Sequence, residues 1–265
     1  MRFAGKVVWI TGASDGIGAA LARALSAEGA RLVLTARNRD KLQAVAEACT
    51  EAAVIPADLA NEADFEALAQ RAIQAFGHLD ALVNNAGVGQ RGTALDTALP
   101  VVREIMEINF FAPVALTQAV VPHFIERGSG RVAVTSSLAG FIGTPARSTY
   151  AASKHAVQGW FESLRAELHG TGVGVTVFVP GYIRTDISLK AKRSDGSSYG
   201  RMAAGNAGGI SADDCAARMV DALAAGRDEV VIAGREKYGV LLKRLAPGLV
   251  RRYLHRAVPE AEEGP

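Results

Sequence analysis

The chain has little of what marks exported, metal-binding or membrane-spanning proteins. Its 265 residues include only two cysteines, Cys49 and Cys215, which form no C-x-x-C pair, so neither a disulfide framework nor a thiolate metal site is expected. No run of about 18 uninterrupted apolar residues, the length of a spanning helix, occurs. The N-terminus shows no cationic region followed by a long apolar run and a cleavage site. We therefore expect a cytoplasmic protein that does not cross a membrane.

The histidines and the basic residues lack the spacing of a metal site or a nucleic-acid site. The five histidines show no ligand pattern such as H-E-x-x-H, so no metal is expected. The net charge is +2, yet residues 235–256 hold seven Arg or Lys and one Glu, which leaves −4 for the rest. This basic cluster has no interleaved aromatics apart from Tyr238 and Tyr253 and no recognition motif. A nucleic-acid partner is therefore not expected.

Short apolar runs alternate with segments of helical period along the whole chain. Strands are expected at 7–10, 31–36, 52–56, 79–83, 131–135, 173–179 and 229–232. Helices are expected near 17–29, 39–49, 61–76, 97–126, 149–169 and 211–225. Several strands are β-branched and apolar with little alternation, as strands covered on both faces are. The pattern predicts a single α/β domain over 1–265, doubly wound around a mostly seven-stranded parallel sheet.

Residues 186–210 interrupt this order. Ser, Gly, Ala and Lys accumulate there without an apolar period. A loop of this length in a compact domain is usually functional. Because it follows the sixth strand, we expect it to fold over the substrate as a lid.

A glycine-rich turn joins the first strand to the first helix. It reads Thr11-Gly12-Ala13-Ser14-Asp15-Gly16-Ile17-Gly18, with the spacing G-x-x-x-G-x-G. Glycines at such a turn let a pyrophosphate approach the backbone at the N-terminus of the helix. The turn therefore predicts dinucleotide binding, with a merely structural turn as the alternative.

The end of the second strand indicates which dinucleotide is bound. An NAD-selective site would place Asp or Glu there to accept from the ribose hydroxyls. The chain has Ala36 and then Arg37, whose guanidinium suits a phosphate. We therefore expect NADP(H), with a solvated surface arginine as the alternative.

Taken in order, these and further motifs resemble the short-chain dehydrogenase/reductase family over about residues 1–232. The motifs are Thr11-Gly12-x3-Gly16-x-Gly18, Asp58, Asn84-Asn85-Ala86-Gly87, Asn109, Ser137, Tyr150-x3-Lys154 and Pro180-Gly181-x3-Thr185. The resemblance implies a Rossmann-like fold, a nicotinamide cofactor, no metal, and a homodimer or homotetramer assembled through long helices. The expected reaction is hydride transfer between the nicotinamide and a carbonyl or secondary alcohol.

Four residues are expected to carry the reaction. Tyr150 and Lys154 lie four apart in a helical segment, hence on one face, where the ammonium favours the phenolate. The family's serine stands thirteen residues before the tyrosine, which selects Ser137 over Ser136; its hydroxyl would donate to the substrate oxygen. By resemblance Lys154 also binds the ribose, and Asn109 holds a water that passes protons to Lys154. Alternatively, Asn109 only bridges backbone groups.

The resemblance also assigns the cofactor contacts. It places Asp58 and Leu59 at the adenine, Asn85-Ala86-Gly87 below the adenosine, and Ile183 and Thr185 at the nicotinamide carboxamide. The full expected set is Gly12, Ser14, Gly16, Ile17, Gly18, Arg37, Asp58, Leu59, Asn85, Ala86, Gly87, Tyr150, Lys154, Pro180, Ile183 and Thr185.

The basic C-terminal tail, residues 235–265, gives an indication of the class of substrate. Within it, residues 238–256 put apolar side chains on one helical face, with a break at Pro247. Such a segment could rest on an anionic membrane, pack on a partner subunit or cap its own site, and a packed helix is favoured. Similar tails in family members that act on lipids and steroids imply a hydrophobic carbonyl substrate. The alternatives are a 3-oxoacyl thioester reductase and a catalytically silent NADPH-binding regulator, against which the intact catalytic residues argue.

Overall fold

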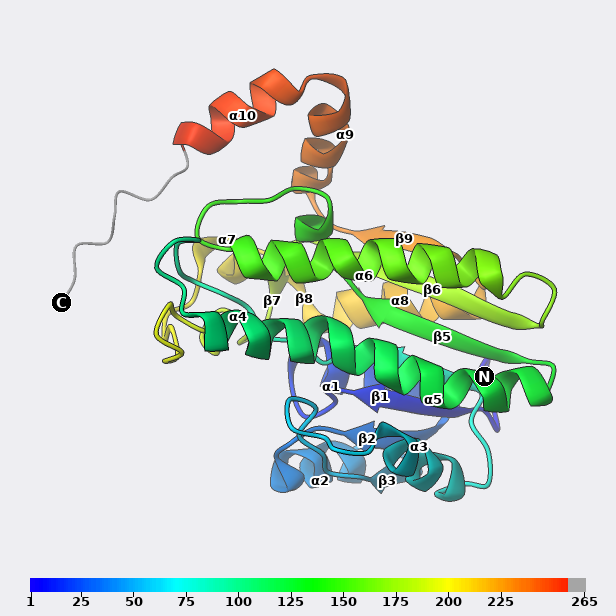
Figure 1. Cartoon of the computed structure of the whole chain (residues 1–265). Coiled ribbons are helices and arrows are strands. Elements are labelled where there is room, and N and C mark those ends of the chain that lie inside the picture. Colours follow the sequence, from blue (N-terminus) through cyan, green and yellow to red (C-terminus); the bar gives the residue numbers. More distant parts are fainter. Residues whose placement is uncertain (257–265) are drawn as a thin grey trace.

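Seven strands form one parallel sheet, shown in the computed structural model, which describes residues 1–256 (Figure 1). They are β1 (Val7–Thr11), β2 (Arg31–Thr35), β3 (Ala52–Val54), β4 (Ala81–Asn84), β5 (Gly130–Thr135), β6 (Val173–Pro180) and β9 (Glu229–Ile232). Their order across the sheet is β3-β2-β1-β4-β5-β6-β9. Because the chain winds outward in both directions from β1 and β4, the expected doubly wound Rossmann-like fold is confirmed.

Helices cover both faces of this sheet (Figure 1). One face carries α1 (Gly16–Ala27), α2 (Arg39–Glu47) and α8 (Ala212–Ala224), and the other carries α3 (Phe65–Gln74), α4 (Leu99–Met106), α5 (Ala112–Glu126) and α6 (Ser148–Glu167). Within β1, Val8 and Ile10 pack into one core, whereas Val7 and Trp9 pack into the other. Burial on both faces explains why the strands are apolar without alternation.

The segment expected as one helix near 97–126 contains a π-helical turn, η1 (Glu107–Phe111), between α4 and α5. By length and composition, Leu99–Glu126 could cross a membrane. However, Leu116, Val120 and Phe124 of α5 are buried in one of the two cores, and Figure 1 shows α5 lying along the sheet. This segment is therefore a core helix of the α/β fold.

After β6 the chain forms shorter elements. The strands β7 (Ile183–Arg184) and β8 (Ile210–Ser211) pair in parallel and close the base of the 186–210 segment, which also contains α7 (Ala204–Ala207). Two short 3-10 helices, η2 (Leu138–Gly140) and η3 (Arg235–Lys237), follow β5 and β9. The last helices, α9 (Tyr238–Leu245) and α10 (Pro247–Arg256), project from the body (Figure 1). Residues 257–265 of the expected tail lie outside the described residues.

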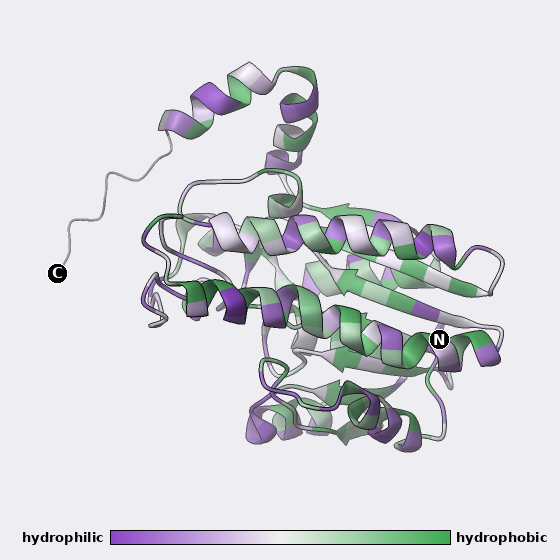
Figure 2. Cartoon of the chain, viewed as in Figure 1, coloured by the Kyte–Doolittle hydropathy of each residue, from purple (hydrophilic) through white to green (hydrophobic). Residues whose placement is uncertain are grey.

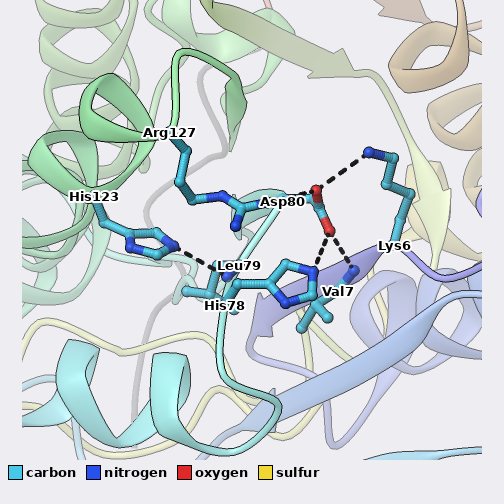
Figure 3. Close-up of polar contacts among 7 residues, drawn as sticks. All are labelled: Lys6, Val7, His78, Leu79, Asp80, His123 and Arg127. Carbon is cyan, nitrogen blue, oxygen red and sulfur yellow. Dashed lines mark hydrogen bonds and ion pairs between the residues drawn. The ribbon is translucent and has the colours of Figure 1, made fainter.

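A polar cluster fixes the amino end of β4, opposite the end that leads to the candidate site (Figure 3). The Asp80 carboxylate accepts from Val7 N at 2.9 Å and from Lys6 Nζ at 3.2 Å, and it pairs with His78 and Arg127. Burial opposes ionisation of Asp80, but these donors hold its pKa below the usual value. Next to it, Leu79 N donates to His123 Nε2 at 3.2 Å, so His123 is neutral in this contact.

We expect a His123→Gln variant to weaken the pH dependence of stability. Burial, with Arg127 nearby, lowers the pKa of His123 below its ordinary value of 6.5. The unfolded chain therefore takes up a proton before the folded one, and the stability that His123 contributes above pH 6.5 is lost as the pH falls. This group adds at most about 1.4 kcal/mol per pH unit to the slope between pH 7 and 5. Urea unfolding at several pH values measures it.

The exposed His169 supplies the matched control, since His169→Gln should leave the slope unchanged. Identical slopes for wild type and His123→Gln would contradict the assignment.

Candidate active site

The glycine turn after β1 is held against the loop that follows β4. Gly12 has φ +65°, and a Cβ built on it would lie 2.7 Å from Ala86 Cα. A Cβ on Gly18 would lie 2.2 Å from Gly12 O and 2.6 Å from Asn85 Nδ2. Asn85 Nδ2 in turn donates to Thr11 O at 3.1 Å. Only glycine fits these two positions. The turn thus leads closely into the N-terminus of α1, where Gly16 N donates to Asp15 Oδ1 at 2.6 Å.

The strand order places the expected residues along the carboxyl edge of the sheet. Arg37 is exposed after β2, and Asp58 follows β3, where it accepts from Ala60 N at 3.3 Å and from Asn61 Nδ2 at 2.9 Å. The turn lies at the centre of this edge, after β1. Thr185 lies beside it, because a Cβ on Gly16 would come within 3.1 Å of Thr185 Cγ2.

Further members of the expected set lie at the same edge. Leu59 and Ile183 are buried after β3 and β6, and Pro180 is the last residue of β6. The expected contacts therefore lie along the carboxyl edge of the sheet at its switch point, where open α/β sheets bind ligands. Arg37 and Asp58 stand at one end of this edge, and the four expected catalytic residues stand toward the other.

Tyr150 and Lys154 lie together near the start of α6. Both are buried, with 5% and 4% of their surface exposed, and Lys154 Nζ is 5.9 Å from the centroid of the Tyr150 ring. Nζ donates to Thr135 O, at the end of β5, at 2.8 Å. Burial lowers the pKa of Lys154 to about 8, with no contribution from a carboxylate of the described chain. Arg147 places a second cation 4.6 Å from the same ring.

The two serines after β5 make different contacts. Ser136 Oγ donates to Lys154 O at 3.3 Å, so its proton is used in a hydrogen bond to the backbone of α6. Ser137 Oγ accepts from Ala139 N at 3.2 Å, and its own proton has no acceptor among residues 1–256. Ser137 is therefore the serine with a hydroxyl proton free to donate to a ligand.

Asn109 lies in the π-helical turn and is buried. Its Oδ1 accepts from Val88 N at 2.8 Å, while Nδ2 donates to Val88 O at 3.0 Å and to Ser153 Oγ at 3.0 Å. The amide thus bridges the backbone after β4 to α6, as the alternative interpretation states. A Cβ on Gly87 would be 3.2 Å from Asn109 Oδ1 and 3.6 Å from Lys154 Nζ, so both polar atoms face the same point. The water-holding role stays a prediction.

Gln90 supports helix α6, although no motif in the sequence pointed to it. It is buried, and its Oε1 accepts from Thr149 N at 2.8 Å and from Tyr150 N at 3.1 Å, while Nε2 donates to Thr97 Oγ1 at 3.0 Å. The residue preceding α6 offers no side-chain cap, so Gln90 satisfies two otherwise orphaned N–H groups. No local pattern could have identified this capping role, because the two N–H groups that Gln90 accepts from lie 59 and 60 residues away.

We expect Gln90→Leu to lower the free energy of unfolding by about 2–4 kcal/mol, because it leaves two buried N–H groups without an acceptor. It should also lower kcat more than it changes the Kd of the cofactor, since Tyr150 is carried by the uncapped turn. Thermal unfolding and steady-state kinetics measure both effects.

The chain offers a matched control in Gln158 on the same helix, whose buried Nε2 has no partner in the described structure. Gln158→Leu should be close to neutral. Equal effects of the two substitutions would refute the capping role of Gln90.

The 186–210 segment contacts two parts of the candidate site. Lys190 forms an ion pair with Asp15, which caps the first turn of α1. Further along, Arg91 N donates to Lys192 O at 2.8 Å, and Lys192 N donates to Gly89 O at 3.0 Å. The segment thus contacts the glycine turn and the loop that holds Gln90.

Known proteins share this sequence and fold. The family described as short chain dehydrogenase matches residues 6–196. Dehydrogenase/reductase SDR family member 7B of Danio rerio is 42% identical over 264 residues, covering 94% of this chain and 84% of that protein. Dehydrogenase/reductase SDR family protein 7-like of Drosophila melanogaster is 36% identical over 254 residues, covering 92% of this chain and 78% of that protein.

Solved structures give the same assignment. A short chain dehydrogenase/reductase from Burkholderia phymatum in complex with NAD has a TM-score of 0.84 at 26% identity, covering 94% of this chain and 96% of that one. A metagenomic short-chain oxidoreductase in complex with NADP has a TM-score of 0.73 at 33% identity, covering 88% and 98%. The chain therefore belongs to the short-chain dehydrogenase/reductase family, whose members are oxidoreductases that bind a nicotinamide cofactor.

Proposed function

We propose that the protein is an NADP(H)-dependent reductase of a hydrophobic carbonyl compound, or a dehydrogenase of the corresponding secondary alcohol. The observation that carries this proposal is the burial of Tyr150 and Lys154 at the carboxyl edge of the sheet, beside the loop that carries Ser137. A proton donor, a fixed cation and a free hydroxyl are the groups that carbonyl reduction requires.

The proposed roles follow from these contacts. When bound, the nicotinamide cofactor supplies or accepts the hydride. Tyr150 donates a proton to the carbonyl oxygen during reduction, and the Ser137 hydroxyl donates a hydrogen bond to the same oxygen. The buried Lys154 ammonium stabilises the phenolate that remains and binds the ribose. Asn109 and Gln90 act as positioning residues for the loop after β4 and for α6.

The preference for NADP(H) rests on the end of β2. Arg37 is exposed there with Ala36 before it, so no carboxylate stands at the position that accepts from ribose hydroxyls in NAD-selective sites. Lys41 adds a second cation, since it lines the open cleft beside Ser14. Both would favour a 2′-phosphate.

We expect Arg37→Asp to raise the Kd of NADPH about 10- to 100-fold, through loss of a charge-assisted hydrogen bond and gain of a repelling charge. NADH should be affected only a few-fold. Fluorescence titration of both cofactors measures the difference, with Arg39→Asp on the neighbouring exposed position as control. Similar losses for NADPH and NADH would reject the assignment.

The rest of the proposal concerns substrate and assembly. The family acts on small molecules and is generally oligomeric; we propose a cytoplasmic homodimer or homotetramer of one catalytic domain with residues 186–210 as the substrate lid. NADP preference favours the direction of reduction. The alternative activity is reduction of a 3-oxoacyl thioester, because Tyr150 and Ser137 would act on the ketone of that substrate in the same way.

NADPH oxidation by the purified protein against ketosteroids, long-chain aldehydes and ketones, and 3-oxoacyl thioesters tests the proposal. Turnover of the apolar carbonyls, absent in Tyr150→Phe, is the expected result. Tight NADPH binding without turnover of any class would replace it with the silent regulator.

A further inference from the structure

The helices α9 and α10 turn apolar side chains toward solvent. We call residues 238–256 the C-terminal arm. In α9, Tyr238, Leu241, Leu242 and Leu245 follow the spacing i, i+3, i+4, i+7, which places them on one face, and all four are exposed, Leu245 to 76%. Figure 2 shows apolar residues on these projecting helices, away from the sheet and its cores. Within residues 1–256, no segment covers this face.

The other side of α9 faces the body with its small and polar residues. Lys243 Nζ donates to Phe141 O at 2.6 Å, and a Cβ on Gly239 would lie 3.5 Å from Ile142 Cδ1. A surface helix of a water-soluble protein normally shows the reverse arrangement, with its apolar stripe inward. The orientation is therefore fixed by contacts that leave the leucines outside.

α10 adds further exposed apolar residues and positive charge. Val250 is buried, whereas Leu249 and Tyr253 are exposed beside Arg251 and Arg252. From residue 237 to residue 256 the sequence contains six Lys or Arg and no Asp or Glu. The arm is thus apolar and uniformly basic.

We propose that the C-terminal arm binds the surface of an anionic lipid bilayer. Leucine and tyrosine side chains of an amphipathic helix enter the boundary between headgroups and acyl chains, and flanking arginines attract anionic headgroups. A second copy of the arm would bring like charges together, and a nucleic acid would leave the leucines in water. An anionic lipid surface complements both the exposed apolar face and the positive charge of the arm.

The arm also adjoins the rim of the candidate site. Phe141 and Ile142 directly follow η2, which begins after Ser137. Glu236, just before the arm, accepts from Tyr182 N at 3.2 Å, in the segment that leads to the lid. Membrane attachment would bring this rim close to the lipid, which favours carbonyl substrates dissolved in the bilayer; this last step rests on the proposed function.

Vesicle flotation with the full-length protein tests lipid binding. Phosphatidylcholine vesicles with about a third phosphatidylglycerol should carry the wild type, and vesicles of phosphatidylcholine alone should not. Leu241→Ser/Leu245→Ser should reduce the bound fraction about ten-fold, and Arg251→Gln/Arg252→Gln should reduce it and weaken its salt dependence, because four of the six cations of residues 237–256 remain. Leu95→Ser, at a side chain that is 97% exposed, is the control and should float like wild type.

Absence of flotation, or equal flotation of the leucine variant, would overturn the proposal. Conversion of a dimer to a monomer by the leucine substitutions, without lipid binding by the wild type, would instead identify a second copy as the occupant. Turnover of a water-soluble carbonyl by the leucine variant is measured in parallel, so failure of lipid binding and failure of the proposed reaction are distinguished.

Discussion

Replacing Tyr150 with phenylalanine should lower kcat for carbonyl reduction by about 10² to 10⁴, the range that general acid catalysis supplies. The substitution removes one hydroxyl from a buried ring. It keeps the aromatic face that lies 4.6 Å from Arg147 Cζ and 5.9 Å from Lys154 Nζ, so both cation contacts persist. The backbone N–H of residue 150 still donates to Gln90. The fold and the binding of the cofactor should therefore remain intact.

The loss should appear in kcat and kcat/KM together, because the proton is donated only in the transition state. Steady-state NADPH oxidation gives both constants, and fluorescence titration checks that the Kd of NADPH changes less than about three-fold. A variant with nearly full turnover would eliminate Tyr150 as the proton donor.

Lys154→Met should inactivate the enzyme by a comparable factor while leaving the fold as stable as the wild type or more so. The ammonium is fully buried and its only hydrogen bond in the described chain is to Thr135 O. Burial lowers the pKa of Lys154 from 10.5 to about 8, so folding at neutral pH keeps a charge in an unfavourable place. Methionine fills the same space without a charge, although Thr135 O then loses its donor.

The pH dependence of stability separates this cause from a general disturbance. Between about pH 8 and 10.5 the unfolded chain retains a proton that folded Lys154 has released, so wild-type stability should rise with pH in this window. In Lys154→Met this rise should be absent. Urea unfolding at pH 7, 8 and 9 measures it, and Lys237→Met, at an exposed site, should behave as wild type. A parallel rise in Lys154→Met would show that another group causes it.

The sheet could be predicted closely because its signals are local. The strand expected at 229–232 is β9, the one expected at 7–10 extends by a single residue to Thr11, and the helix expected at 149–169 is α6, Ser148–Glu167. Each is fixed by its own run of apolar residues and by its burial.

Other features depend on partners far away in the sequence. The π-helical turn holds Asn109 against Val88 and Ser153, and neither partner is within twenty residues of it. The contacts of Gln90 and the pairing of β7 with β8 are similarly remote. For the arm, the helical period predicted an apolar face, but only the three-dimensional structure shows that this face points outward, through the exposure of its leucines and the contact of Lys243 with Phe141.

The strand order also separates two properties along the chain. Arg37 and Asp58, which are expected at the adenosine end, precede residue 60, whereas Ser137, Tyr150 and the 186–210 segment all follow residue 130. The two groups are joined in the sheet where β1 pairs with β4, and there the hydroxyl of Thr11 accepts from both Asn85 N and Ala86 N at 3.1 Å. The residue expected to select the 2′-phosphate and the residues expected to carry the reaction therefore come from separate stretches of the chain. We expect a chimera joined between β3 and α3 to take its preference between NADPH and NADH from the parent that supplies Arg37, and its catalytic residues from the other.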